Sequence, residues 1–140
     1  MQISGIGSTP QIPAAAGNSR KAAQIQKFRA LVDAHFKDHL TIEDYAGKLG
    51  ISAGQLSRLS RELLGRSPLD VINARILHEA ERDLVYTSTT IKQLAGALGF
   101  EDEACFGRFF RKHTGLSPKD FRRHALTELA LPHQLADSRQ

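Results

Sequence analysis

The fold is decided by the stretch TIKQLAGALG, residues 90–99, which repeats the earlier stretch TIEDYAGKLG, residues 41–50. Thr, Ile, Ala, Gly, Leu and Gly recur at an offset of 49 residues. After one additional residue in the second copy the offset becomes 50, and the matches continue with Arg58, Arg61, Gly65, Ser67, Pro68 and Asp70 against Arg108, Arg111, Gly115, Ser117, Pro118 and Asp120. This self-similarity indicates a duplicated structural unit of about 30 residues.

Each copy predicts a short helix, a glycine turn and a second helix. A small residue in the first helix lets the second helix cross closely over it, and the glycine adopts the left-handed conformation that ends the first helix. The residue after the glycine is expected to insert into the core. These paired positions are Ala46 and Ala95, Gly50 and Gly99, and Ile51 and Phe100.

The second helix of each copy has one apolar and one polar face. The residues expected to be buried are Leu56, Leu59 and Leu63 in the first copy and Phe106, Phe109 and Phe110 in the second. This pattern is typical of a helix-turn-helix, in which the first helix supports the second and the second lies in the DNA major groove. The sequence therefore predicts tandem units over about 41–65 and 90–115, with double-stranded DNA as the partner.

Every other periodic segment also predicts a helix, so the expected fold class is all-α with about seven helices. Thr41 is the expected N-cap of its helix, with Asp44 at the third helical position in an acidic relative of the capping box. No run alternates with the period of two that a strand requires. The remaining expected helices span about residues 24–36, 53–64, 69–86, 91–98 and 103–113, and a last one begins at residue 118.

The domain boundaries follow from composition. Residues 1–19 contain no charged side chain and are rich in Gly, Ser, Pro and Ala, a composition that buries too little apolar surface to order a chain. We therefore expect a flexible leader over 1–22, one DNA-binding domain over 23–125 and a C-terminal tail over 126–140. The helix over 69–86 connects the two helix-turn-helix units. Its length is roughly 27 Å, and successive major-groove segments on one side of a duplex lie roughly 34 Å apart. With the bodies of the units at each end of the helix, one monomer is expected to address both segments.

The composition is that of a globular protein without a membrane span or secretory signal, so a cytoplasmic setting is expected. As a DNA-binding protein the chain is expected to be nucleoid-associated. The formal net charge is +4 and the mean hydropathy is −0.31. Residues 20–40 hold 5 basic and 2 acidic side chains, residues 41–65 hold 3 of each, and residues 90–124 hold 7 and 4. The single cysteine, Cys105, excludes an internal disulfide framework.

The segment GFEDEACFGRFFRKHTGLSPKDFR, residues 99–122, resembles the signature of the AraC/XylS family of bacterial regulators. The resemblance extends over roughly residues 24–124 and implies a seven-helix module that activates transcription through contact with RNA polymerase. The segment 28–36 is most similar to regulators of aromatic-acid catabolism. Two features depart from the pattern: Cys105 stands where the family has Ser, and Gly54 and Gly107 occupy DNA-facing positions. Family members commonly carry a further effector or dimerisation domain, and only with such a domain is dimerisation expected.

Helical spacing places a set of polar or small residues on the faces expected to meet DNA. By the resemblance, Arg58 and Arg108 reach base edges, where an arginine fork pairs with guanine. Arg61, Arg111 and Lys112 are expected to hold phosphates. The full set of candidate DNA-binding residues is Ser52, Gly54, Gln55, Ser57, Arg58, Arg61, Glu103, Ala104, Gly107, Arg108, Arg111 and Lys112.

Some of these residues have a second interpretation. Gln55 is suited to contacts with either bases or phosphates. Glu103 could accept from a cytosine amine, but with Glu101 and Asp102 it is better explained as complementing the helix dipole. Three acids make the start of this helix a poor site for phosphates. We therefore expect the first unit to make more of the base contacts.

Other chemistries find little support in the sequence. His35 and His39 are one helical turn apart, but no third ligand is near them, so we expect no metal site and no cofactor. Cys105 is expected to be a small packed residue rather than a redox sensor. No phosphate-binding glycine loop and no catalytic triad spacing is present, so an enzyme is not expected. The alternative to a DNA-binding regulator is a helical protein-interaction module that retains the fold without reading DNA.

Overall fold

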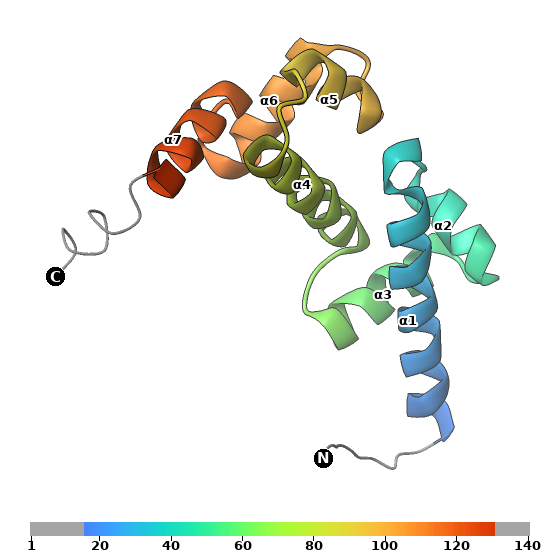
Figure 1. Cartoon of the computed structure of the whole chain (residues 1–140). Coiled ribbons are helices and arrows are strands. Elements are labelled where there is room, and N and C mark those ends of the chain that lie inside the picture. Colours follow the sequence, from blue (N-terminus) through green and yellow to red (C-terminus); the bar gives the residue numbers. More distant parts are fainter. Residues whose placement is uncertain (1–15, 131–140) are drawn as a thin grey trace, which may run out of the picture. The chain divides into compact units, whose positions relative to one another are not determined.

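The computed structural model describes residues 16–130, which fold into seven α-helices and one short 3-10 helix and contain no strand (Figure 1). The all-α prediction is confirmed. The helices are α1 (Ala16–His35), η1 (Phe36–Asp38), α2 (Ile42–Leu49), α3 (Ala53–Leu64), α4 (Pro68–Tyr86), α5 (Ile91–Ala97), α6 (Glu103–Thr114) and α7 (Pro118–Ala130). No helix in this part of the chain is long and apolar enough to cross a membrane.

The chain divides into two compact units, with the boundary between Asn73 and Ala74 inside α4. Unit 1 contains α1, α2, α3 and the first residues of α4, and α1 contacts both α2 and α3. Unit 2 contains the rest of α4 with α5, α6 and α7, and α6 contacts both α5 and α7. Each unit therefore holds one of the two predicted helix-turn-helix pairs, α2–α3 and α5–α6.

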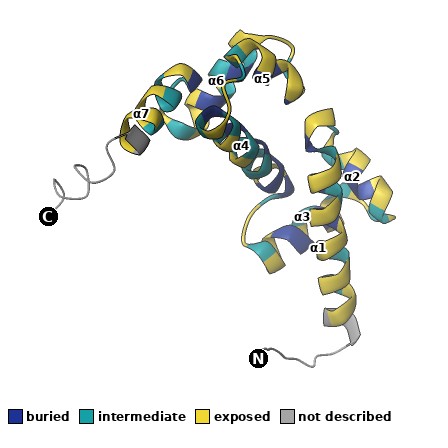
Figure 2. Cartoon of the chain, in the orientation of Figure 1, coloured by how far each residue is buried: buried dark blue, intermediate teal, exposed yellow. Residues whose placement is uncertain are grey.

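The core of unit 1 receives buried side chains from α1, α2, α3 and the start of α4 (Figure 2). The ring of Phe28 meets the ring of Tyr45 edge to face, with centroids 5.7 Å apart. Leu56 is fully buried, as the apolar stripe predicts. The other buried apolar residues of this core are Ile25, Val32, Phe36, Ala46, Leu59, Val71 and Ile72.

The core of unit 2 combines a run of neighbouring aromatic rings with the buried leucines Leu84, Leu94 and Leu98. Phe106 and Phe110 are fully buried with centroids 5.7 Å apart, and Phe110 meets Phe121 edge to face at 5.2 Å. Phe109 is only half-buried and packs against Phe100 at 5.1 Å. Helix α6 therefore has Phe106 and Phe109 where α3 has Leu56 and Leu59, and Phe109 contributes less burial than predicted.

Local signals placed the ends of the helix-turn-helix helices correctly. Thr41 caps α2 through a capping box with Asp44, as predicted, and Gly50 ends that helix with φ 73°. Gly99 has φ 89° after α5, so its predicted left-handed conformation is confirmed. The structure adds an equivalent capping box at Thr90 and Gln93. A capping box joins residues that lie within four positions of each other in the sequence, so these helix ends can be predicted from the sequence alone.

The burial of α3 corrects one prediction. Leu63, expected in the buried stripe, lies in the last turn of the helix and is 41% exposed. Ser60 is fully buried instead, and its hydroxyl donates to the Arg66 carbonyl at 2.6 Å. A serine is tolerated there because the chain that follows the helix returns to supply an acceptor for its hydroxyl.

Helix α1 begins at Ala16, within the region predicted as a leader and before the apolar stripe starts at residue 24. The early turns carry an ion pair to α3, with Lys21 Nζ 3.2 Å from Glu62 Oε2. Apolar periodicity gives no signal for these turns, so the sequence analysis did not include them in the helix. Residues 1–15 of the predicted leader lie outside the described residues. At the other end α7 continues past residue 125 to Ala130, and residues 131–140 lie outside as well.

His35 and His39 are not on one helix, contrary to the spacing argument. Helix α1 ends at His35, η1 follows, and His39 has a left-handed backbone with φ 54°. His35 Nδ1 lies 3.0 Å from Asp38 Oδ2. Within residues 16–130 no group of three His, Cys, Asp or Glu side chains is arranged to hold a metal ion.

Candidate nucleic-acid interface

The second helix of unit 1, α3, presents a polar face away from its core. Arg58 and Arg61 are exposed on this face, and neither has an ion-pair or hydrogen-bond partner among residues 16–130. Gly54 is exposed and Ser57 is half-buried. A Cβ at Gly54 would have only the Ser52 hydroxyl oxygen nearby, at 3.9 Å, so neighbouring protein atoms leave this part of the face open.

Ser52 and Gln55 are engaged with each other at the start of α3. The Ser52 hydroxyl accepts from the Gln55 backbone N–H at 3.1 Å, and the Gln55 side-chain oxygen accepts from the Ser52 backbone N–H at 2.9 Å. This capping box gives both residues a structural role that the sequence analysis had not assigned to them. The amino group of Gln55 is the part of its side chain left to donate to a ligand.

Helix α6 of unit 2 presents the corresponding face. Glu103, Ala104, Arg108, Arg111 and Lys112 are exposed. Gly107 is half-buried, and a Cβ added there would meet no neighbouring atom within 4 Å. The Arg108 guanidinium donates to the Cys105 sulfur at 3.4 Å. This hydrogen bond engages one nitrogen of the guanidinium and leaves its other donors free.

The three acids at the start of α6 are Glu101, Asp102 and Glu103, and Asp102 has a defined role. Asp102 is the N-cap, and its Oδ1 accepts from the Cys105 backbone N–H at 2.8 Å. That hydrogen bond, followed by one from the Cys105 thiol, holds the pKa of Asp102 below its ordinary value. The same thiol hydrogen bond raises the pKa of Cys105, so the thiol stays protonated at neutral pH. A protonated thiol agrees with the predicted packing role of Cys105.

Replacing Asp102 with asparagine is expected to weaken the dependence of folding stability on acid. Asn retains an N-cap acceptor but does not titrate. Because the pKa of Asp102 is lowered in the folded chain, its contribution is present above the ordinary aspartate pKa and is lost as the pH falls through the lowered value. Urea unfolding at neutral and acid pH checks this. The difference in free energy of unfolding between wild type and D102N should shrink toward zero in acid. A difference that stays constant with pH would contradict the assignment of Asp102 as a titrating N-cap.

A groove in unit 2 adds a residue that the sequence analysis missed. It has a volume of about 510 Å³ and is lined by Glu103, Ala104 and Gly107 of α6, by Ile91 of α5 and by Ser117, Pro118 and Lys119. Three of the predicted site residues therefore share one hollow with the exposed cation Lys119. Only the packing of α7 against α6 brings Lys119 there, although it lies next to the Ser-Pro pair of the repeat.

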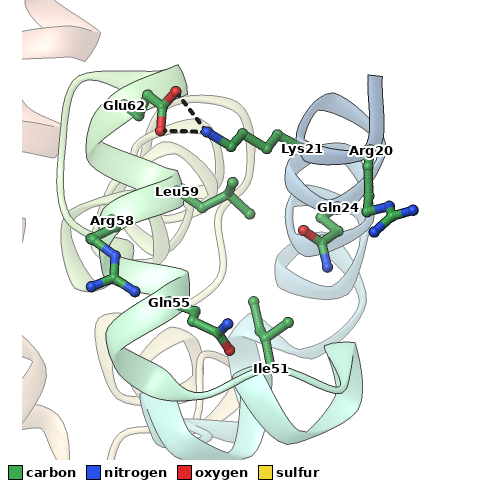
Figure 3. Close-up of a pocket in the computed structure, with 8 residues that line it drawn as sticks. All are labelled: Arg20, Lys21, Gln24, Ile51, Gln55, Arg58, Leu59 and Glu62. Carbon is green, nitrogen blue, oxygen red and sulfur yellow. Dashed lines mark hydrogen bonds and ion pairs between the residues drawn. The ribbon is translucent and has the colours of Figure 1, made fainter. Parts of the chain in front are cut away.

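A second groove lies in unit 1 between α1 and α3 (Figure 3). It joins the predicted residues Gln55 and Arg58 to Arg20, Lys21 and Gln24 of α1, which sequence reasoning did not include in the site. The excess of basic residues over 20–40 is the sequence signal that could have pointed to this part of α1. We name this hollow the α1–α3 groove.

A scan against protein families matches residues 45–124 to a helix-turn-helix domain. Over 100 residues the chain is 29% identical to a lactose operon transcription activator of Staphylococcus xylosus, a match that covers 71% of this chain and 36% of that protein. The chain therefore spans about a third of the length of this curated relative.

Two solved structures share the fold. The C-terminal domain of AraT, a response regulator from Geobacillus stearothermophilus, aligns with a TM-score of 0.70 and 28% identity and covers 75% of this chain and 88% of that domain. A transcriptional regulator of the AraC-type DNA-binding class from Chromobacterium violaceum aligns with a TM-score of 0.65 and 29% identity, covering 79% and 96%. Both matches include the tandem helix-turn-helix arrangement predicted from the repeat.

Proposed function

The chain belongs to the AraC/XylS-type helix-turn-helix family of DNA-binding transcription regulators, and on this premise we propose that it reads a specific duplex sequence with α3 and α6. This membership places the chain among transcription regulators and not among enzymes. The observation that carries the proposal is the pair of arginines at matching positions of the repeat, Arg58 and Arg108, both exposed on the second helix of their unit.

The division of labour on DNA follows from the residue types. Arg58 and Arg108 pair with base edges, because a guanidinium fork matches the two acceptors of guanine in the major groove. Arg61, Arg111 and Lys112 are exposed further along the helices and neutralise phosphates. Ser57 is available for a base contact, whereas Ser52 and Gln55 mainly fix the start of α3.

One chain contacts two successive major-groove segments in this proposal. The support is the duplication itself, which gives each unit its own second helix, α3 in unit 1 and α6 in unit 2. Each unit contacts one major-groove segment with its own recognition helix. A single chain is therefore sufficient for binding. We also propose that the chain activates transcription through contact with RNA polymerase and that it is located at the chromosome. The link to aromatic-acid catabolism stays a prediction, since the named relative is an activator of a lactose operon.

Selection of bound duplexes from a random library tests the function directly. At physiological salt we expect enrichment of one sequence with two conserved blocks about 10 base pairs apart, protected together by a single chain. The unselected library, bound at the same salt, is the control for non-specific affinity. If no sequence is enriched over random duplex, the proposed function is wrong and a protein-interaction module is favoured.

A further inference from the structure

The α1–α3 groove has an apolar floor and a polar rim. Leu59 and Ile51 line the bottom, and the volume is about 520 Å³. Its other lining residues are Arg20, Lys21 and Gln24 from α1 and Gln55, Arg58 and Glu62 from α3. All of them belong to unit 1, so the groove is a property of one compact body.

The charges around this groove are predominantly positive. The lining residues include three cations, Arg20, Lys21 and Arg58, and one carboxylate, Glu62. Lys21 Nζ lies 3.3 and 3.2 Å from the two oxygens of that carboxylate and closes one end of the groove (Figure 3). Arg20 and Arg58 stand on opposite rims, and neither has an ion-pair partner among the described residues. The rim therefore retains two free guanidinium groups.

The groove lies directly beside the face of α3 that is proposed to read bases. Arg58 belongs to both, as a lining residue of the groove and as an exposed residue of the recognition helix. A helix in the major groove is flanked by the phosphate backbones of the duplex, because that groove is only about 12 Å wide. A phosphate backbone beside α3 would thus meet the α1 side of the helix.

The polar groups of the groove suit a phosphate oxygen. The Gln55 side-chain oxygen already accepts from the Ser52 backbone N–H, so its amino group is what remains to donate. The Gln24 amide adds another donor from α1, and Figure 3 shows both amides between the two helices. Glu62 alone would repel a phosphate, but its ion pair with Lys21 offsets that charge.

We propose that the α1–α3 groove seats the phosphate backbone of bound DNA, with Arg20 and Gln24 of α1 as phosphate contacts and Lys21 as the group that neutralises Glu62. This inference rests on the proposed function and extends the interface of unit 1 to a helix outside its helix-turn-helix. Two of the five basic residues over 20–40, Arg20 and Lys21, receive a role in this way.

The first test is R20A, measured by binding to the selected duplex and to random duplex over a range of salt concentrations. A lost phosphate contact lowers both affinities by the same factor and reduces the slope of log affinity against log salt by about 1. The matched control is R29A, which removes an exposed arginine from α1 outside the groove and should leave the slope unchanged. Equal slopes for wild type and R20A would overturn the proposal.

The second test is a double-mutant cycle on Lys21 and Glu62. K21A should weaken DNA binding, because it leaves the Glu62 carboxylate without its cation, whereas K21A combined with E62Q should restore the affinity. Circular dichroism checks that each variant remains folded. If K21A weakens binding equally with and without E62Q, Lys21 does not act by neutralising Glu62 and that part of the proposal is wrong.

The variant R58A separates failure of the groove from failure of the function. If R58A abolishes preference for the selected duplex while R20A and K21A change neither affinity nor salt slope, the chain reads DNA but the groove does not hold its backbone. If wild-type protein binds no duplex at all, both proposals are wrong. A reduced salt slope in R20A together with recovery in the double variant supports the groove.

Discussion

Replacing Arg58 and Arg108 together with alanine is expected to reduce the free energy of binding to the selected duplex by about 2–6 kcal/mol. Each guanidinium fork contributes about 1–3 kcal/mol of discrimination at a guanine. The two contributions should nearly add, because the arginines lie in different compact units and share no partner. Arg108 has to give up only a 3.4 Å hydrogen bond to the Cys105 sulfur to reach a base. Fluorescence anisotropy with the selected and a scrambled duplex measures the loss.

The lysine variants R58K and R108K provide the control for charge. Lysine retains the positive charge but lacks the planar fork that pairs with two acceptors at once. We expect these variants to bind scrambled DNA as tightly as wild type and to lose preference for the selected sequence. If lysine preserves the preference, the arginines act as phosphate contacts and the assignment to base edges is wrong.

Truncating Leu56 to alanine is expected to lower the free energy of unfolding by about 2–5 kcal/mol, a large fraction of the stability of a small domain. Leu56 is fully buried in unit 1, so alanine loses apolar burial and leaves a cavity. L63A makes the same chemical change seven positions later in the same helix, where the side chain is 41% exposed, and should cost much less.

Urea unfolding followed by circular dichroism compares the two leucine variants. A large fall in the midpoint for L56A, with a small change for L63A, is the expected result. Equal losses would mean that Leu63 is buried in solution and that the apolar stripe predicted from periodicity holds along the whole of α3. The pair therefore tests the burial seen in the structure independently of any assay of DNA binding.

Much of the candidate interface could be predicted from the repeat alone. Arg58 and Arg108 occupy matching positions in the sequence, and both are exposed on the predicted helices. The local engagement of Ser52 and Gln55 was missed, although the spacing of Ser and Gln three residues apart at a helix start signals a capping box. The contribution of α1 was missed because Lys21 and Glu62 are 41 residues apart and no local pattern joins them.

The sequence by itself determined the all-α fold class, most of the helix ends and the exposed polar faces of α3 and α6. It could do so because caps, left-handed glycines and helical periodicity act over a few neighbouring residues. Only the tertiary structure decided that Ser60 is buried while Leu63 is exposed, and that α1 completes a basic groove beside α3. Those outcomes depend on groups from distant segments, since burial and ion pairing are set by the elements that pack together and not by the residues next in the chain.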